Sequence, residues 1–202
     1  MAATNSTKSR RKEEVKLLQN KILDAALQLA TKEGWAGVTI RKIAKIIRYS
    51  PPAIYRYFDS KDDIMIALYR RALQTFKSYV YQEAEVPNLR EGMVIGAEKY
   101  WNFGFENPEL YELLFTIHTP HFKEEKDIEE GKNMFMEGLR MIEAINPTLD
   151  FAKQHDMLAN YLSLMHGFVH LALCNKLYTY EGGAPDAKEA MIRAVRRFVQ
   201  TI

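Results

Sequence analysis

Two consecutive prolines, Pro51 and Pro52, place the strictest limit on the fold of this chain. A proline inside a helix removes a hydrogen bond and collides with the preceding turn, whereas the first turn of a helix has amides without an internal acceptor and tolerates it. The run Ser50-Pro51-Pro52 therefore predicts the start of a short helix that ends near Phe58. Because proline at the second position has no N–H group, the Ala53 amide is the main one that the Ser50 hydroxyl can cap.

Helices are predicted on both sides of this start. From Glu13 onward, apolar residues recur at three- and four-residue spacing, which predicts an amphipathic helix that ends at Gly34. Thr39 can cap a second helix, and Ser60 with Asp63 three residues on has the spacing of a capping box for a fourth. The apolar face of the first helix consists of Ile22, Leu23, Ala26, Leu27, Leu29 and Ala30.

Prolines and glycines divide the remaining sequence into further helical segments. No stretch alternates apolar and polar residues as a strand would, so the predicted fold is all-α with about nine helices. One domain boundary is expected within or just after the fourth helix. Residues 1–12 are small, polar and basic without periodicity and are predicted to be a disordered arm. The breaks lie at Pro87-Asn88, Asn107-Pro108, Thr119-Pro120, Asn146-Pro147 and residues 181–185.

The segment 39–58 is a pair of short amphipathic helices joined by a tight turn, and such a pair can place its second helix in the major groove of DNA. Arginine and lysine supply charge for phosphates, tyrosine hydroxyls donate to phosphate oxygens, and the amides beside Lys61 offer an anion site. The alternative is a helical hairpin inside an ordinary bundle. The residues predicted to be buried are Ile40, Ile43, Ala44, Ile54 and Phe58. Those predicted to stay outside are Arg41, Lys45, Arg48, Pro51, Tyr55, Arg56 and Tyr57.

Charge is distributed unevenly along the 202 residues, although the net charge is only +2. Residues 1–61 hold 13 Lys and Arg against 5 Asp and Glu, and residues 62–202 hold 15 against 21. A basic N-terminal piece on an acidic remainder favours contact of one end with a polyanion, although a solvated charged surface gives the same count. The basic residues of the arm are either a flexible tail or contacts to the minor groove or to phosphates. They are Lys8, Arg10, Arg11 and Lys12.

Residues 43–64 resemble the DNA-binding domain of the tetracycline-repressor (TetR) family. The match consists of Ile43-Ala44 and then Ser50-x-x-x-Ile54-Tyr55-x-Tyr57-Phe58-x-Ser60-Lys61-x-x-x-Ile64, and the resemblance runs from about Lys16 to Phe76. It implies a flexible basic arm at 1–15, a DNA-binding domain at 16–76 with its helix-turn-helix at 39–58, and a ligand-binding and dimerisation domain at 77–202. The residues that it implies for phosphates are Thr39, Tyr55, Tyr57 and Lys61, with Ser50 among the DNA-binding residues. Those implied to lie nearest the base edges are Arg41, Pro51, Pro52, Ala53 and Arg56.

Two positions depart from the family. Where the family usually has glycine and valine between the two helices, this chain has Arg48-Tyr49, and arginine in a left-handed conformation costs about 1 kcal/mol. A distorted turn is one expectation. Secondly, Pro51-Pro52-Ala53 offers only apolar surface and backbone to bases, so direct base recognition is expected to depend on thymine methyl groups, Arg41 and Arg56.

The resemblance weakens beyond Phe76. The stretch 107–115 and Met165-His166-Gly167 are similar to a subgroup with a Trp and His-Gly signature, although the tryptophan expected shortly before the histidine is missing. Apolar stripes on 151–178 and 186–201 predict a four-helix dimer interface, in which Gly167 permits close approach, or packing within one chain. The interface residues expected are Leu158, Leu162, Met165, Val169, Met191, Val195 and Phe198. Eight residues are expected to form either an apolar effector pocket or a plain hydrophobic core. They are Trp101, Phe105, Tyr111, Phe115, His118, Phe135, His166 and His170.

No metal ion or other cofactor is expected. His166 and His170 lie four residues apart, and His118 and His121 three apart, as metal ligands on a helix can, but neither pair is expected to have a cysteine or carboxylate partner at ligand spacing. Cys174 lies among apolar residues and is predicted to be a small buried side chain. Nor does the sequence contain a nucleophile triad, a phosphate-binding glycine loop or a paired carboxylate in a plausible context, so an enzyme is disfavoured.

The sequence therefore predicts a homodimeric transcriptional regulator that binds double-stranded DNA. A cytoplasmic location is expected because no apolar stretch suits a membrane span or a secretory signal. By resemblance, the protein is a repressor that binds a palindromic operator and is released by a small, largely apolar effector. The alternative is a DNA-binding regulator whose C-terminal domain recruits a protein partner and senses no small molecule.

Overall fold

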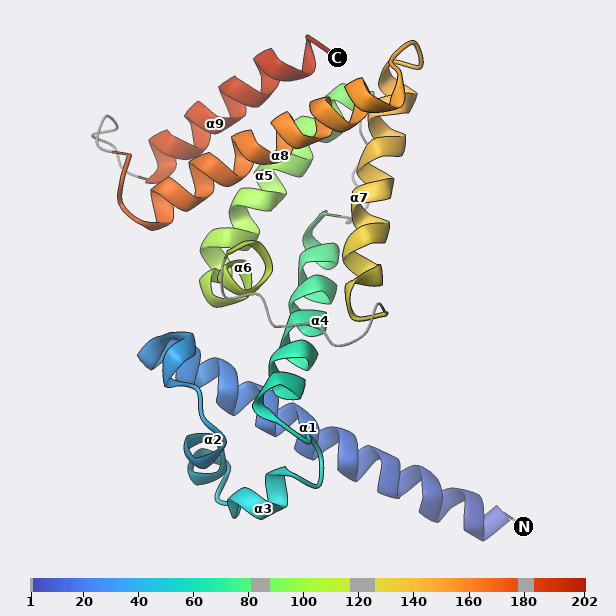
Figure 1. Ribbon diagram of the computed structural model, residues 1–202, viewed down its shortest axis with the longest axis vertical. Helices are drawn as coiled ribbons and strands as arrows, with labels where there is room; N and C mark the ends of the chain where they lie inside the picture. The colour runs from blue at the N-terminus through green and yellow to red at the C-terminus, as the bar shows by residue number, and fades with distance from the viewer. Residues whose placement is uncertain (1, 81–87, 117–125, 178–183) are drawn as a thin grey trace. The chain divides into compact units, whose positions relative to one another are not determined.

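The computed structural model describes residues 2–80, 88–116, 126–177 and 184–202, and the regular secondary structure of this part of the chain is entirely helical (Figure 1). Its helices confirm the all-α prediction, and no described helix is both long and apolar enough to cross a lipid bilayer. In chain order they are α1 (Ala2–Gly37), α2 (Ile40–Ile47), α3 (Pro51–Ile54), α4 (Lys61–Val80), α5 (Leu89–Glu106), α6 (Pro108–Phe115), α7 (Lys126–Ile145), α8 (Phe151–Leu173) and α9 (Ala184–Val199).

The described residues form two compact units. The first contains residues 2–71 and 112–116, and the second contains residues 72–80, 88–111, 126–177 and 184–202. Helix α4 supplies its first half to the first unit and its second half to the second.

The core of the first unit follows the apolar periodicity of α1. Ile22 and Ala26 are fully buried, as are Ile43 of α2 and Ile64 of α4. The predicted faces are largely confirmed, except that Leu27 and Ile40 are half-buried. Burial of apolar side chains on one stripe of each helix is what holds such short helices together, because an isolated helix of eight residues is unstable in water.

Helix ends in the first unit agree with the local signals of the sequence in most places. The backbone of Gly34 has φ 71° and ψ 170°, a conformation open mainly to glycine, and it interrupts α1 three residues before the helix ends at Gly37. The Thr39 hydroxyl accepts a hydrogen bond from the Lys42 amide at 3.3 Å, and the Ser60 hydroxyl accepts one from the Asp63 amide at 3.1 Å. Both predicted N-caps are confirmed.

Three local expectations were wrong. Helix α1 begins at Ala2 and not at Glu13, because a polar and basic run without proline or glycine continues the helix and Arg10 pairs with Glu14 one turn on. Helix α3 ends at Ile54, and residues 55–57 form turns. The Ser50 side chain caps no amide, because its own carbonyl accepts the bond from the Ala53 amide at 2.9 Å.

The second unit is organised around α8. Helices α5 and α9 pack against α8 and against each other, and α7 packs along α8. The side chains of Asn88 and Asp150 cap α5 and α8. At the C-terminus, Ile202 is buried and its carbonyl accepts a hydrogen bond from the Asn146 side-chain amide at 2.6 Å.

The expected dimer stripe is mostly internal to one chain. Leu158, Met165 and Val169 of α8 are at most 4% exposed, and Met191 and Val195 of α9 are fully buried. These five residues were wrongly assigned to an interface, because the stripe of each helix is already covered by its neighbours in the same chain. Leu162 is 38% exposed and Phe198 is half-buried.

Candidate nucleic-acid interface

The turn between α2 and α3 is built on a strained residue. Arg48 has φ 59° and ψ 44°, a left-handed conformation, so the expected distortion of the turn is not observed. Its amide donates to the carbonyls of Ala44 and Lys45, which satisfies the end of α2, and the Tyr49 amide donates to the Ala44 carbonyl at 2.9 Å. The chain therefore makes the turn with regular hydrogen bonding at a cost of about 1 kcal/mol in backbone strain.

Most of the residues predicted to meet DNA lie on the surface of α2, α3 and the turn that follows. Arg41, Pro52 and Arg56 are exposed, and Tyr55 is 51% exposed. Ile54 between them is buried and anchors the segment to the core. The remaining predicted residues are Thr39 and Ser50, both exposed, and Pro51, Ala53, Tyr57 and Lys61, all half-buried.

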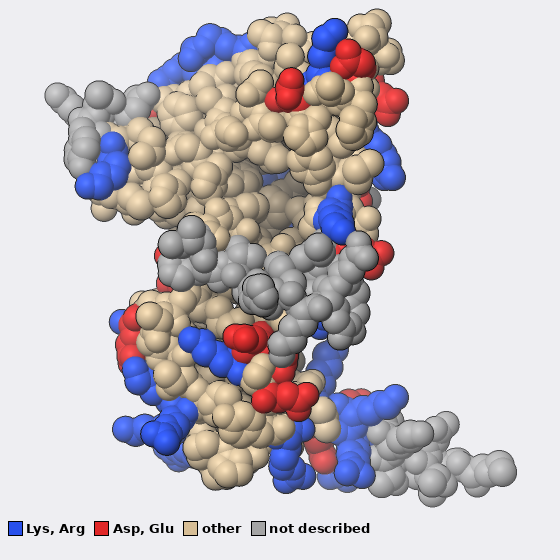
Figure 2. Space-filling model, in the orientation of Figure 1, with Lys and Arg blue, Asp and Glu red and all other residues tan. Residues whose placement is uncertain are grey.

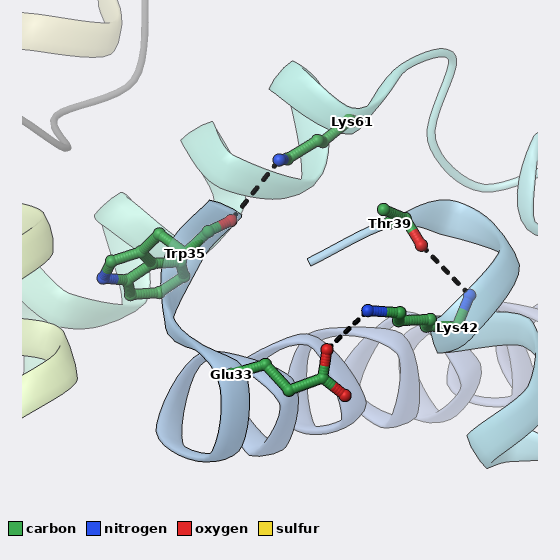
Figure 3. A network of polar contacts seen from close by, with 5 residues as sticks. All are labelled: Glu33, Trp35, Thr39, Lys42 and Lys61. Carbon is green, nitrogen blue, oxygen red and sulfur yellow. Dashed lines mark hydrogen bonds and ion pairs between the residues drawn. The ribbon is translucent and has the colours of Figure 1, made fainter. Parts of the chain in front are cut away.

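Lys61 is the first residue of α4, and its side chain reaches the end of α1. Its ammonium donates to the carbonyl of Trp35 at the end of α1, at 3.5 Å (Figure 3). Acidic residues Asp62 and Asp63 follow in the first turn of α4, where they complement the helix dipole. The Lys61 ammonium and the capped N-terminus of α4 therefore lie beside the end of α1. Together they can bind one phosphate group.

Sequence reasoning missed one contact next to this site. The Glu33 carboxylate accepts a hydrogen bond from the Lys42 ammonium at 2.5 Å, so α1 holds a cation of α2 (Figure 3). Both side chains are partly exposed, at 42% and 47%. The two residues are nine apart in the sequence, and no motif links them, so no signal in the sequence pointed to the pair.

Positive charge gathers at the end of the first unit that carries α2 and α3 (Figure 2). Besides Arg41 and Arg56, this surface has exposed Lys45 and Arg48. Arg10, Arg11 and Lys12 are exposed on α1. A surface with several cations, two tyrosines and a helix start is suited to the phosphate backbone of DNA, with Arg41 and Arg56 available for base edges.

The residues predicted to form an effector pocket fall into separate groups. Trp101 stacks on Phe105 with ring centroids 4.6 Å apart, and Phe135 packs against His155 at 5.3 Å. Phe115 is half-buried in the first unit, and His118 lies outside the described residues. His170 is exposed on α8. The described side chains therefore do not bring the eight residues together around one space.

Tyr111 and His166 form the polar centre of the second unit. The Tyr111 hydroxyl lies 2.7 Å from His166 Nδ1, and the Tyr100 hydroxyl lies 3.4 Å from the same nitrogen. Burial raises the pKa of Tyr111 to about 12, and burial together with the charge of His170 lowers the pKa of His166 below its usual value. A neutral His166 and protonated tyrosines are thus favoured near pH 7, and this group can accept or donate hydrogen bonds.

A cavity of about 310 Å³ lies elsewhere in the second unit, between the start of α5 and the end of α9. It contains none of the predicted pocket residues. Arg196 forms a two-pronged ion pair with Glu91 along it, with both distances 2.8 Å, and Arg90 donates to the Val199 carbonyl at 3.0 Å. Because its charged groups already satisfy one another, the cavity has the character of a surface groove and not of an apolar effector site.

Comparison with known proteins places the clearest similarity in the first unit. Residues 22–68 match the sequence model of the bacterial regulatory proteins of the tetR family. The nucleoid occlusion factor SlmA of Glaesserella parasuis is 29% identical over 131 residues, which is 64% of each chain. This chain spans less than two thirds of the length of the curated relatives that it matches, such as these SlmA proteins.

Solved structures share the fold of the whole chain. A Rhodococcus protein described as having unknown function has a TM-score of 0.77 at 17% identity, over 92% of this chain and 95% of that one. A variant of TetR from Acinetobacter baumannii, solved in complex with minocycline, has a TM-score of 0.61 at 17% identity, over 89% of this chain and 93% of that one. At such low identity the similarity concerns the fold alone.

Proposed function

Because the chain belongs to the TetR family of bacterial regulatory proteins through its N-terminal domain, we propose that it is a transcriptional regulator that binds double-stranded DNA. The observation that carries this proposal is the surface of α2, α3 and the following turn. Arg41 and Arg56 are exposed there, and Tyr55 and Lys61 flank them at positions suited to phosphates. Arg41 and Arg56 are assigned to base edges, and Thr39, Tyr55, Tyr57 and Lys61 to phosphates.

The regulator acts as a homodimer on a palindromic operator. One helix-turn-helix covers a half-site, and two copies related by a two-fold axis meet half-sites about 34–36 Å apart. One face of α8 is the candidate contact, because Phe151 and Leu162, eleven residues apart and so on the same side of the helix, are large apolar residues that are 65% and 38% exposed. A Cβ atom at Gly167 would meet nothing within 4 Å, so that part of α8 leaves room for a second backbone.

A small, largely apolar effector binds the second unit and releases the DNA, so the protein is a repressor. Supporting this, Trp101, Phe105 and Tyr111 supply aromatic surface, and the Tyr111–His166 pair supplies a polar contact. The effector must bind one arrangement of the helices better than the other, since equal affinity for both would shift no population. Helix α4 is the candidate link, since it contributes residues to both units.

A second candidate function is recruitment of a protein partner without an effector. The name nucleoid occlusion factor SlmA, which some relatives carry, mentions neither transcription nor an effector and so fits this candidate. So does the burial of Trp101 and Tyr111, which are 4% and 1% exposed and therefore serve as core residues in this arrangement.

The test is a fluorescence-polarisation titration on DNA from the intergenic region upstream of the chain's own coding sequence, against a scrambled duplex, across a salt series. We expect tight, salt-dependent binding that prefers the native duplex, with two or four chains per duplex. Arg41→Ala and Arg56→Ala should each reduce this preference and change the bases selected, whereas Arg197→Ala, an exposed arginine on α9, should change neither.

Equal losses on specific and random DNA in both variants would refute the assignment of Arg41 and Arg56 to base edges. If the duplex from the upstream region gains no preference, a selection from random sequence decides whether any specific operator exists. Absence of a selected sequence would contradict the regulator proposal. Release of the selected DNA by apolar compounds supports the repressor with an effector, and a partner protein that binds the DNA complex without such release supports recruitment.

A further inference from the structure

The last two turns of α8 bring a histidine and the single cysteine of the chain together on the surface. Cys174 Sγ lies 3.8 Å from His170 Nε2, and both side chains are exposed. The prediction that Cys174 is buried was wrong, because it follows the last buried position of the stripe, Val169, and caps the helix end. The expectation that neither histidine pair has a cysteine partner at ligand spacing was wrong for His170, because Cys174 follows it by four residues and its Sγ lies near His170 Nε2.

The distance between the two atoms suits a shared metal ion. In a tetrahedral site with Zn–N of about 2.0 Å and Zn–S of about 2.3 Å, two such ligands are about 3.5 Å apart. A small side-chain rotation would bring Nε2 and Sγ to that separation. Residues four apart on a helix face the same side, so the backbone already places both ligands for chelation.

The electrostatics of the site favour a cation. Cys174 is the C-cap of α8, where the negative end of the helix dipole lies. This field stabilises a metal ion and disfavours an isolated thiolate, so a metal site is better supported than an activated cysteine nucleophile.

We propose that His170 and Cys174 chelate a borderline or soft divalent cation of the zinc class, with water or a second copy of the chain completing the coordination. Thiolate and imidazole are the ligands that such cations prefer, and the thiol releases its proton to solvent when the metal binds. Among the described residues, no group of three or more His, Cys, Asp or Glu is placed around one metal ion, so the described part of one chain supplies two ligands.

The site borders the polar centre of the second unit. The His166 ring stacks on the His170 ring with centroids 5.6 Å apart, and His166 Nδ1 lies 2.7 Å from the hydroxyl of buried Tyr111. A cation on His170 is therefore two contacts away from the core between α5, α6 and α8. This gives the bound metal a physical route by which it can change the packing of the second unit.

The test is a titration of the full-length, reduced protein with Co²⁺, followed by displacement with Zn²⁺. We expect a thiolate-to-cobalt absorption band that disappears in Cys174→Ser, and an affinity at least about tenfold lower in His170→Ala. His155→Ala removes another exposed histidine of α8 and should leave the titration unchanged. A band that Cys174→Ser retains, no band at all, or unchanged affinity in His170→Ala would overturn the proposal.

Thermal unfolding gives a second measurement. Zn²⁺ should raise the Tm of the wild type and of His155→Ala, and should leave that of Cys174→Ser unchanged, because a ligand that binds only the folded state stabilises it. An equal rise in Tm for all three proteins would count against the pair. Neither measurement uses DNA, so a negative result here leaves the proposed regulator function untouched.

Discussion

The two units differ in whether their candidate functional side chains are exposed or buried. In the first unit, cations and tyrosines lie on the surface of a segment of about twenty residues, each placed by a cap or turn close to it in the sequence. In the second unit, aromatic rings from α4, α5, α6 and α8 contact one another, and Tyr100, Phe103 and Tyr111 are at most 4% exposed. Functional residues can therefore be assigned one by one in the first unit, whereas in the second each residue is also part of the core.

The largest effect is expected from a core residue of the second unit. Phe103 is fully buried and packs edge-on against Phe76 at 5.0 Å and Tyr79 at 5.6 Å. Phe103→Ala should lower the free energy of unfolding by about 3–5 kcal/mol, measured by urea denaturation. Leu17→Ala, a truncation to alanine at a 62% exposed position, should change it by less than about 0.5 kcal/mol. Similar losses in both variants would contradict the contrast between core and surface.

Surface residues of the first unit should alter DNA binding without altering stability. Lys61→Ala removes a cation from the start of α4 and should weaken binding to every duplex by about tenfold, with the salt slope reduced by about one. Tyr55→Phe should weaken binding to all sequences by a few-fold, because only a hydroxyl is lost. Polarisation titrations at several salt concentrations measure both effects. A changed sequence preference with an unchanged salt slope would mean that these residues do not hold phosphates.

The strained turn offers a gain in stability. Arg48→Gly should raise the free energy of unfolding by up to about 1 kcal/mol, because glycine adopts φ 59° without the steric cost that arginine meets. Arg48→Ala loses the same charge and keeps the strain, so it should give no gain. Urea midpoints distinguish the two variants, and equal midpoints would argue that the turn holds no strain.

Loss of the ion pair between Glu33 of α1 and Lys42 of α2 should change the affinity for DNA less than the substitutions at Lys61 and Tyr55 do. Glu33→Gln removes the negative charge beside Lys42, so the free ammonium adds to the basic surface. We expect random duplexes to bind a few-fold more tightly, with a steeper salt dependence. Asp24→Asn is the matched control, because it removes another carboxylate of α1, the one that pairs with Arg71 of α4. It should leave the salt slope unchanged. A slope that both variants leave unchanged would show that Lys42 does not reach the phosphates.

The smallest effect expected is a pH dependence in the second unit. Burial lowers the pKa of His166 in the folded chain, so the unfolded chain binds a proton first as the pH falls below about 6.5. The stability contributed by neutral His166 is therefore complete above that pH and is lost progressively below it. In His166→Gln, which keeps a polar group near Tyr111, urea midpoints should fall less between pH 7 and pH 5 than in the wild type. An identical fall would assign the acid sensitivity to other groups.

Local features of the fold followed from the sequence where a few neighbouring residues suffice. The caps at Thr39 and Ser60 and the interruption of α1 at Gly34 were predicted, because a cap joins residues three apart and a backbone conformation belongs to one residue. The family resemblance of residues 43–64 rests on the same short-range pattern and is confirmed.

Long-range features were decided by tertiary packing. The stripe of Leu158, Met165 and Val169 is apolar whether it meets a neighbouring helix of the same chain or a second copy, so its pattern could not show which one covers it. The pairing of Glu33 with Lys42 and the exposure of Cys174 beside His170 depend on where helix ends fall. The sequence by itself determined the kind of module and the class of fold, because helix periodicity and caps are local. Only the tertiary structure decided which side chains remain at the surface, because burial depends on neighbours that are distant in the chain.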